Sequence, residues 1–342
     1  MSKKYDLIVY IGRFQPFHNA HYEILCRAKA LAKKVIVIIG SAEQPRTYKN
    51  PFTDYERNAI MISDWEISIH CVKDSMYNDQ AWAIRVQEAV SKHVYDNFYP
   101  DDENIKIGII GHEKDESSFY LKMFPQWDHI DVECIEPLHS TDIRELYFRK
   151  DANMNFIKGV VPEHVFEFLK TFKETSHYQQ IVREREFIQT YKKQFENLPY
   201  PPVFVAADSV VVQSGHILMV KRRAEPGKGL LALPGGFLET TKDKSMTDCA
   251  IRELKEETGI KVPVPVLLGS IKGSKVFDAI GRSARGRTIT NAVYIQLPDG
   301  PLPKVKGADD AEKAMWIPIG ELSSSECFED HYSIITTMLG IE

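Results

Sequence analysis

The sequence has few cysteines, and no two of them stand in a Cys-x-x-Cys spacing. Its five cysteines are scattered over 342 residues: Cys26, Cys71, Cys134, Cys249 and Cys327. An odd and dispersed set argues against a disulfide framework and against a cysteine-based zinc site. We therefore look elsewhere for the chemistry of this chain.

Long hydrophobic runs and an excess of positive charge are also missing. No apolar stretch approaches the roughly 18 residues of a membrane span, and no signal-peptide pattern opens the chain. The formal net charge is −5, which is unlike the basic footprint of nucleic-acid-binding proteins. We expect a cytoplasmic protein that binds neither membranes nor nucleic acid. Small anionic ligands stay compatible with this charge, because helix N-termini and local cations hold them.

The apolar sequence that is present suffices for two cores. The chain has 342 residues, 43% of them hydrophobic, and domains average ~150 residues. Residues 6–11, 34–40 and 105–111 are predicted strands, continuously apolar and alternating with helical patterns. This pattern is typical of a parallel, doubly wound α/β sheet, whose ligands bind at the carboxyl ends of the strands.

The pattern changes after residue 172. Residues 173–198 are highly charged, with apolar side chains at roughly helical spacing, and "PYPP" follows at 199–202. We predict a connecting helix here, as a spacer or an interface, and then a strand pair that turns at Gly215. The domains are placed at 1–172 and 199–342.

The first candidate site is the stretch "GRFQPFHNAH" at 12–21. Gly12 lets the backbone approach a ligand closely, and His18 and His21 lie three residues apart near a predicted helix start. Helix N-termini attract phosphate, and histidine donors there stabilise charge on a phosphoryl group. The alternative is two unrelated histidines in a loop.

A second stretch, "HSTDIRELYF" at 139–148, strengthens the phosphate interpretation. Ser140 and Thr141 are candidate N-caps of another helix. Arg144 then lies in the first turn, where its guanidinium could clamp phosphate oxygens. The alternative for Arg144 is an ordinary surface ion pair.

Both stretches resemble the G-R-F-x-P-x-H-x-x-H and S-x-x-I-R signatures of the nucleotidyltransferase superfamily. Within it, the chain is similar to archaeal-type nicotinamide mononucleotide (NMN) adenylyltransferases, as "NPFTDYERNAI" (50–60), "NDQAW" (78–82) and "GHEKDESSFYLKMFP" (111–125) indicate. The resemblance implies a Rossmann-like domain in which NMN attacks ATP, giving NAD and pyrophosphate without a covalent enzyme intermediate. Mg²⁺ is then expected to arrive with ATP.

The resemblance also implies residue roles. His18 and His21 would contact the ATP phosphates and stabilise the transition state, while Arg144, Ser140 and Thr141 would hold the β- and γ-phosphates.

Other residues would bind the remaining parts of the nucleotides. Those expected at the adenylate end are Gly12, Arg13 and Phe14. Trp82 would stack on the nicotinamide ring, with a buried core tryptophan as the alternative. Asp115 and Arg57 are further ligand-binding candidates, each with a structural ion pair as the alternative.

The second candidate site is the stretch "RELKEETGI" at 252–260. On a helix, Glu253, Glu256 and Glu257 share one face, and a divalent cation would relieve their mutual repulsion. A solvated acidic helix face is the alternative. The Gly-Gly turn upstream and Gly259 downstream favour a binding site.

This stretch resembles the second half of the Nudix box, G-x5-E-x7-R-E-U-x-E-E-x-G-U, where U is bulky and apolar. The first half departs from it, because Lys244 stands where the first glutamate belongs and two extra residues separate it from Gly236. In the family that glutamate braces the arginine, here Arg252, and Asp243 is the neighbour that could replace it.

The Nudix resemblance implies an α/β/α sandwich that hydrolyses ADP-ribose to AMP and ribose 5-phosphate with Mg²⁺ or Mn²⁺. The implied metal ligands are Glu253, Glu256, Glu257 and the Gly236 carbonyl, with Glu253 and Glu257 also as catalytic groups. The general base stays open and includes the later loop acids Asp309, Asp310 and Glu312.

Substrate specificity is assigned to another stretch, "FDAIGRSARGRTITNAVYI" at 277–295. Its sequence is similar to that of Nudix domains fused to NMN adenylyltransferases. The side chains of Arg282, Arg285 and Arg287 suit a pyrophosphate substrate. A flexible basic loop is the alternative.

Together the motifs predict a bifunctional enzyme of NAD turnover. Its expected ligands are ATP, NMN, NAD, pyrophosphate, ADP-ribose and AMP. The alternatives are nicotinate mononucleotide or phosphopantetheine as acceptor, and a catalytically weak second domain that senses ADP-ribose or NAD. The sequence leaves the oligomeric state open, a homo-oligomer included.

Overall fold

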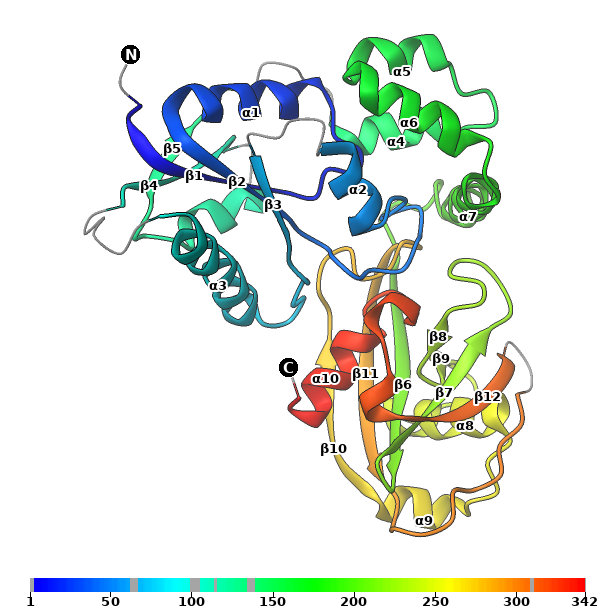
Figure 1. Cartoon of the computed structure of the whole chain (residues 1–342). Coiled ribbons are helices and arrows are strands. Elements are labelled where there is room, and N and C mark those ends of the chain that lie inside the picture. The colour runs from blue at the N-terminus through cyan, green and yellow to red at the C-terminus, as the bar shows by residue number, and fades with distance from the viewer. Residues whose placement is uncertain are drawn as a thin grey trace. The chain divides into compact units, whose positions relative to one another are not determined.

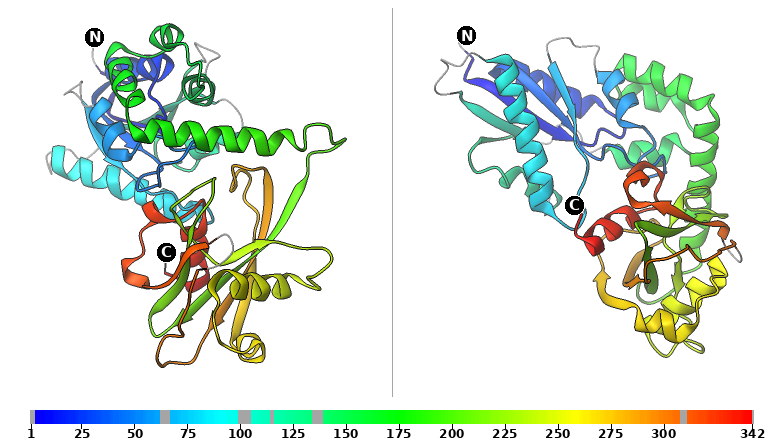
Figure 2. Two further views of the ribbon diagram at one scale, coloured as in Figure 1. Left: turned by 90° about the vertical axis from the view of Figure 1, so that its right-hand side faces the viewer. Right: turned by 60° about the horizontal axis from the view of Figure 1, so that its bottom comes forward.

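The computed structural model describes residues 3–61, 67–98, 105–113, 116–133, 139–307 and 311–341. Contacts divide the chain into two compact units, Met1–Val182 and Arg183–Glu342. The division falls within helix α7 (Ser176–Lys193), which Figure 2 shows as one long helix. The charged segment that was predicted to connect the domains is therefore helical over most of its length.

The described part of the first unit contains a five-stranded parallel sheet with the order β3-β2-β1-β4-β5. Its strands are β1 (Tyr5–Gly12), β2 (Ala32–Ile39), β3 (Ile67–Cys71), β4 (Ile107–Gly111) and β5 (Asp128–Asp131). Its helices are α1 (Asn19–Leu31), α2 (Asp54–Met61), α3 (Asp79–Asn97), η1 (Glu116–Lys122), α4 (Ser140–Tyr147), α5 (Met154–Val160) and α6 (Glu163–Lys173).

Both faces of this sheet are buried, which explains why β1 is continuously apolar. Successive side chains of a strand point to opposite faces. Ile8 and Tyr10 belong to the apolar cluster under α1 and α4, whereas Leu7 and Val9 belong to the cluster under α3. Figure 1 shows α1 and α3 on opposite sides of the sheet. The doubly wound prediction is confirmed.

The strand order places the candidate motifs at one edge. The chain runs outward from β1 to β2 and β3, then returns to β4 on the other side of β1 and continues outward to β5, so the strand order reverses between β1 and β4. In such sheets ligands bind outside the carboxyl ends of the strands at this reversal. β1 ends at Gly12 and β4 ends at Gly111. The quoted stretches 12–21 and 111–125 continue from these two strand ends.

The described part of the second unit contains a seven-stranded mixed sheet with the order β10-β11-β6-β7-β12, β8 pairing with β7 and β9 with β6. Its strands are β6 (Val203–Gln213), β7 (His216–Arg222), β8 (Leu231–Ala232), β9 (Gly235–Phe237), β10 (Ile271–Phe277), β11 (Arg287–Gln296) and β12 (Ala311–Pro318). Its helices after α7 are α8 (Met246–Thr258), α9 (Val264–Gly269), η2 (Ile319–Glu321), η3 (Ser324–Glu326) and α10 (His331–Leu339).

Helices cover both faces of this second sheet, as an α/β/α sandwich requires. Figures 1 and 2 show α8 and α10 on opposite sides of the strands. Leu254 and Cys249 of α8 are fully buried against Val211 and Val293 of the sheet. The predicted hairpin is also present, because β6 and β7 pair antiparallel around Gly215, which has φ +74°. Among the described residues, no helix is long and apolar enough to cross a lipid bilayer.

Candidate active sites in the two units

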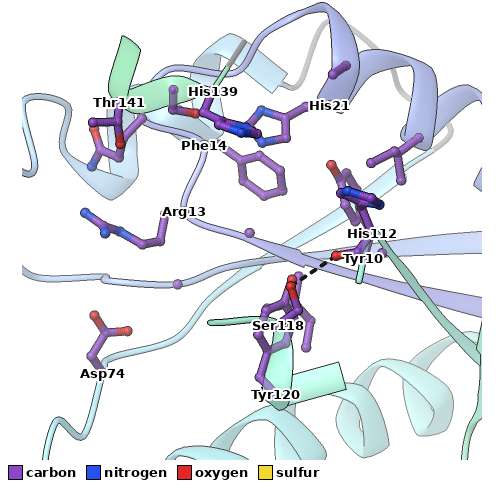
Figure 3. A pocket seen from close by; sticks show the side chains of 18 of the residues that line it. Tyr10, Arg13, Phe14, His21, Asp74, His112, Ser118, Tyr120, His139 and Thr141 are labelled. Atoms are coloured by element: carbon purple, nitrogen blue, oxygen red, sulfur yellow. Dashed lines mark hydrogen bonds between the residues drawn. The ribbon is translucent and has the colours of Figure 1, made fainter. Parts of the chain in front are cut away.

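A cavity of about 620 Å³ lies at the carboxyl ends of β1 and β4 in the first unit. Its lining includes nine of the residues that the sequence placed there: Gly12, Arg13, Phe14, His18, His21, Trp82, Ser140, Thr141 and Arg144. Figure 3 shows side chains from both motifs around this cavity. The tertiary structure thus brings the two motifs together.

Hydrogen bonds join the second motif directly to the first. Ser140 Oγ donates to the Pro16 carbonyl at 3.1 Å, and Arg144 Nη1 donates to the Gln15 carbonyl at 2.6 Å. The Gln15 side chain in turn exchanges two hydrogen bonds with the backbone of Phe52. The loop after β1 is therefore held in place by residues distant in sequence.

Arg144 is a buried cation at the cavity. It is 8% exposed, and its Nη2 donates to Thr141 Oγ1 at 3.1 Å. Burial, with the nearby Arg13, lowers the pKa of Arg144 to about 10, which still leaves it charged at neutral pH. Its Nε is buried and finds no hydrogen-bond partner in the described part of the chain. Such a donor fits an anionic ligand better than the surface ion pair weighed above.

The two histidines of the first motif lie side by side at the start of α1. Their ring centroids are 3.8 Å apart. Burial lowers the pKa of His18 to about 4 and holds the pKa of His21 well below its usual range. Both rings are therefore neutral near pH 7, and His21 Nδ1 has no partner among the described residues. Neutral imidazoles can donate N–H groups to phosphate oxygens.

Gly12 makes room for a neighbouring aromatic side chain. A Cβ at this position would lie 2.6 Å from the ring of Phe14, so the glycine makes room for that ring. Phe14 has φ +49° and contacts the edge of the His21 ring at a centroid distance of 5.0 Å. The glycine thus acts through Phe14 and His21, although it also lines the cavity.

Trp82 lines the cavity and also packs against two aromatic side chains. It lies in the first turn of α3, and its ring packs edge-on against Tyr120, with centroids 6.2 Å apart, and against Phe124 at 6.0 Å. It is half-buried and lines the cavity. Its packing restricts the orientation of the indole, which suits a stacking surface.

The ligand-binding prediction for Arg57 is corrected by its hydrogen bonds. Arg57 is 1% exposed and donates to the carbonyls of Arg13 at 2.7 Å, Gly40 at 2.6 Å and Ser41 at 2.8 Å. Because its guanidinium is engaged by backbone carbonyls, Arg57 holds the loops after β1 and β2 together and does not reach the cavity. Asp115 lies outside the described residues.

Several lining residues were missed by the sequence analysis. They are Tyr10, Asp74, His112, Ser118, Tyr120 and His139. Asp74 follows β3 and accepts hydrogen bonds from the backbone N–H and hydroxyl of Ser41. Ser118 donates to the His112 carbonyl, the dashed line of Figure 3. Position directly after a strand is the signal that could have found Asp74 and His112.

The second site is organised by Arg252 on α8. Its Nε and Nη2 donate to the two carboxylate oxygens of Asp243 at 2.8 and 2.7 Å, and Nη2 also reaches the Phe237 carbonyl. The Asp243 side chain is 2% exposed, and the Arg252 guanidinium holds the pKa of that carboxyl well below its usual range. Asp243 therefore does what the missing box glutamate was expected to do.

The three glutamates do not form a ready metal cluster. Glu253 Oε1 and Glu256 Oε2 both accept hydrogen bonds from Arg252 Nη1, at 2.8 and 2.9 Å. Across the residues that the structure describes, no three His, Cys, Asp or Glu side chains are placed to hold a metal ion as they stand. Arg252 thus engages two of the three carboxylates that were predicted to bind a metal.

Glu257 and Gly236 nevertheless suit a divalent cation. Glu257 is 8% exposed and accepts a hydrogen bond from Gly235 N–H at 3.0 Å. Burial, with Glu253 and Asp208 nearby, raises the pKa of Glu257 to about 8. A Cβ on Gly236 would lie 2.3 Å from Glu253 Oε1, so only glycine leaves room for that carboxylate. A hard divalent cation takes oxygen ligands such as the Glu257 carboxylate and the Gly236 carbonyl, and its charge would stabilise the ionised form of the buried carboxylate.

The three arginines of the specificity stretch have different surroundings. Arg282 forms a buried two-pronged ion pair with Asp330 at 2.8 and 2.9 Å, so its predicted substrate contact is corrected to a structural role. Arg287 donates to the Asp278 carbonyl. Arg285 lies over the ring of Phe237 at 5.0 Å, and its buried Nε has no partner within the described ranges.

Of the later loop acids, only Glu312 lies among the described residues. Glu312 forms an ion pair with Lys221 at 3.6 Å, and Asp309 and Asp310 lie outside the described residues. Asp208 on β6 was missed by the sequence analysis. It is 6% exposed, accepts a hydrogen bond from Thr290 Oγ1 at 2.6 Å and lies close enough to raise the pKa of Glu257.

The Asp243–Arg252 pair makes a testable prediction. Asp243→Asn removes the charge that orients Arg252, so we expect the hydrolytic rate of the second unit to fall about 10- to 100-fold. Lys244→Glu is the control, because Lys244 is exposed and Asp243 already holds the arginine. Steady-state rates of both variants check this. A gain in rate for Lys244→Glu with no loss for Asp243→Asn would contradict the assignment.

The two units match different family models. Residues 9–146 match the cytidylyltransferase-like family. Residues 203–337 match the NUDIX domain. The two matches contain the two candidate sites.

Curated relatives and a solved structure agree with this division. The nicotinamide/nicotinic acid mononucleotide adenylyltransferase of Acinetobacter baylyi is 36% identical over 52% of this chain and 92% of the relative. The ADP-ribose pyrophosphatase of Methanocaldococcus jannaschii is 34% identical over 38% of this chain and 70% of the relative. A bifunctional NMN adenylyltransferase/ADP-ribose pyrophosphatase from Francisella tularensis, solved with AMP and a manganese ion, has a TM-score of 0.87 and 35% identity. That match covers 98% of this chain and 99% of that one.

Proposed function

The chain belongs to the family of bifunctional NMN adenylyltransferase/ADP-ribose pyrophosphatases, and from this premise we propose the reaction of each unit. The first unit transfers the adenylyl group of ATP to NMN, giving NAD and pyrophosphate. The second hydrolyses ADP-ribose to AMP and ribose 5-phosphate with a divalent metal. One observation carries the first assignment: two hydrogen-bonded motifs enclose one cavity, which holds two neutral histidines and an Arg144 Nε donor with no partner in the described part of the chain.

The first reaction needs positioning and charge stabilisation rather than a nucleophile from the protein. A 5′-phosphate oxygen of NMN bonds to the α-phosphorus of ATP, and the bond from that phosphorus to the bridging oxygen breaks. The electron pair leaves with pyrophosphate, so no proton transfer is required. Arg144 and the N-terminus of α4 bind the departing phosphates. His18 and His21 donate to oxygens on the reacting phosphorus. Mg²⁺ enters as the ATP complex and neutralises phosphate charge.

The charges of the cavity favour NMN over nicotinate mononucleotide as the acceptor. Among the described lining residues are the carboxylates Asp74, Asp79 and Glu133. Asp79 and Trp82 are three residues apart on α3 and so lie on one face of the helix. A nicotinate carboxylate stacked on Trp82 would face negative charge, whereas the neutral amide would not.

In the second reaction, the pyrophosphate of ADP-ribose lies between the α8 carboxylates and Arg285. The residues that would hold the metal are Glu253, Glu257 and the Gly236 carbonyl, with Glu256 joining once it leaves Arg252. The metal supplies charge neutralisation and Lewis-acid polarisation of the pyrophosphate. Water adds to one phosphorus while the bond from that phosphorus to the bridging oxygen breaks. Arg285 offers the substrate an Nε donor that has no partner among the described residues, and Asp243 keeps Arg252 oriented.

A panel of substrates tests both halves on the whole protein. With ATP, Mg²⁺ and NMN we expect NAD and pyrophosphate, and a lower kcat/KM with nicotinate mononucleotide. With Mg²⁺ or Mn²⁺ we expect AMP and ribose 5-phosphate from ADP-ribose, and no product when EDTA replaces the metal. Coupled pyrophosphate detection and chromatography of AMP give the rates. ADP-ribose that binds in calorimetry but yields no AMP would make the second unit a sensor instead.

A further inference from the structure

Besides His18 and His21, the cavity of the first unit is lined by His112 and His139, and neither of the two resemblance signatures includes His139. His139 directly precedes Ser140 and so lies at the N-terminal end of α4. Figure 3 shows its side chain beside Phe14 and His21, on the same side of the cavity as Thr141. The site is thus approached by imidazoles from two helix N-termini, those of α1 and α4.

The imidazoles of His18, His21 and His139 are near enough to affect one another electrostatically. His139 acts with burial to lower the pKa values of both His18 and His21. The same wall of the cavity holds Arg144, 8% exposed and with its Nε unpartnered within the described ranges. N–H donors gathered on one wall of a cavity are stabilised by an anion placed among them.

We propose that His139 is a further phosphate-contacting residue of adenylyl transfer, which donates a hydrogen bond to the pyrophosphate portion of ATP. This inference rests on the proposed function of the first unit. The position in the fold selects the pyrophosphate portion, because His139 starts the helix that carries Ser140, Thr141 and Arg144. Negative charge grows on this portion as the bond to the α-phosphorus breaks, so a fixed donor there stabilises the transition state more than the ground state.

The start of α4 is a capping box to which the side chains of His139 and Asp142 both contribute. The Asp142 carboxylate accepts a hydrogen bond from the backbone N–H of His139 at 2.9 Å, and this contact uses no side-chain atom of residue 139. Asparagine is among the most favoured residues at a helix N-cap. His139→Asn therefore preserves the start of α4 while removing the ring, which separates a structural role from a ligand contact.

The test compares His139→Asn and His139→Gln with wild type, in both directions of the reaction. We expect kcat/KM for ATP to fall about 10- to 100-fold, which is the loss of one hydrogen bond to a charged group. In the reverse direction KM for pyrophosphate should rise about tenfold, while KM for NMN in the forward direction stays within twofold. His164→Asn is the matched control, because His164 is exposed on α6 and does not line the cavity.

Folding controls and kinetic constants together decide the outcome. Melting temperature and ADP-ribose hydrolysis report folding of the variants. Wild-type values of kcat/KM for ATP and of KM for pyrophosphate in both folded variants would overturn the inference, while NAD formation by wild type would still uphold the proposed function. An equal rise in KM for NMN would also overturn it, because only general distortion of the cavity explains that result. Failure of wild type to form NAD would instead refute the proposed function.

Discussion

His18→Ala lowers the rate of NAD formation about 100- to 1,000-fold and leaves ADP-ribose hydrolysis at the wild-type rate. The imidazole is 5% exposed, lies at the cavity and is held neutral by burial, which lowers its pKa to about 4. Its loss removes the donor that we propose for the reacting phosphorus, and water that enters the space is not fixed in the same way. The effect should fall on kcat more than on KM for ATP.

The fold tolerates this change. His18 precedes α1, but its side chain makes no capping hydrogen bond there, so alanine removes no cap. Single-turnover NAD formation measures the chemical step, and AMP release from ADP-ribose by the same preparation serves as the internal control. If the folded variant loses both activities, the two sites are not independent. Wild-type NAD formation by the variant would remove His18 from the mechanism.

Glu257→Gln lowers ADP-ribose hydrolysis at least about 100-fold and leaves NAD formation unchanged. Glutamine keeps the size of the side chain and the oxygen that accepts the Gly235 N–H, which lies 3.0 Å away. What it loses is the negative charge that we assign to the metal. The matched control is Glu312→Gln, since the structure pairs Glu312 with Lys221 on the sheet.

The same variant has a defined effect on stability in metal-free buffer. Burial raises the pKa of Glu257 to about 8, so its charged form is disfavoured in the folded protein. A group with a raised folded-state pKa loses its stabilising contribution as pH rises through that value. Wild type should therefore lose melting temperature between about pH 5 and pH 8 relative to Glu257→Gln. Added Mn²⁺ should raise the melting temperature of wild type more than that of the variant. Equal responses of both proteins to Mn²⁺ would contradict the metal assignment.

Arginine residues show where sequence reasoning fails. Arg57, Arg144, Arg282 and Arg285 all stand in or beside glycine-containing or motif-bearing stretches, and the sequence marks each as a ligand-binding candidate. Only Arg144 and Arg285 keep an unpartnered Nε in the part of the chain that is described. Arg57 is saturated by carbonyls and Arg282 by Asp330. Whether a guanidinium is free depends on residues up to dozens of positions away, which local spacing does not encode.

For Asp243, by contrast, the sequence identified a candidate partner of Arg252 that the structure confirms. Counting along the box identifies Lys244 at the glutamate position and Asp243 as its neighbour. The structure decides between them, because the inserted residues let the backbone of Glu239 and the Arg252 guanidinium both bind the Asp243 carboxylate. Motif spacing predicts which groups are near each other only when no insertion bends the loop between them.

The sequence by itself determined the strands, the helices and the two motif sets of this protein, since these follow from short-range periodicity and residue spacing. The apolar runs of β1 and β2 and the cap of α8 at Gly259 are of this kind. Only the tertiary structure decided which side chains share a cavity. His139 approaches His21, and Arg144 donates to the Gln15 carbonyl, because segments far apart in the sequence pack at one edge of a sheet. Burial and long-range hydrogen bonds set those contacts and the pKa values that accompany them.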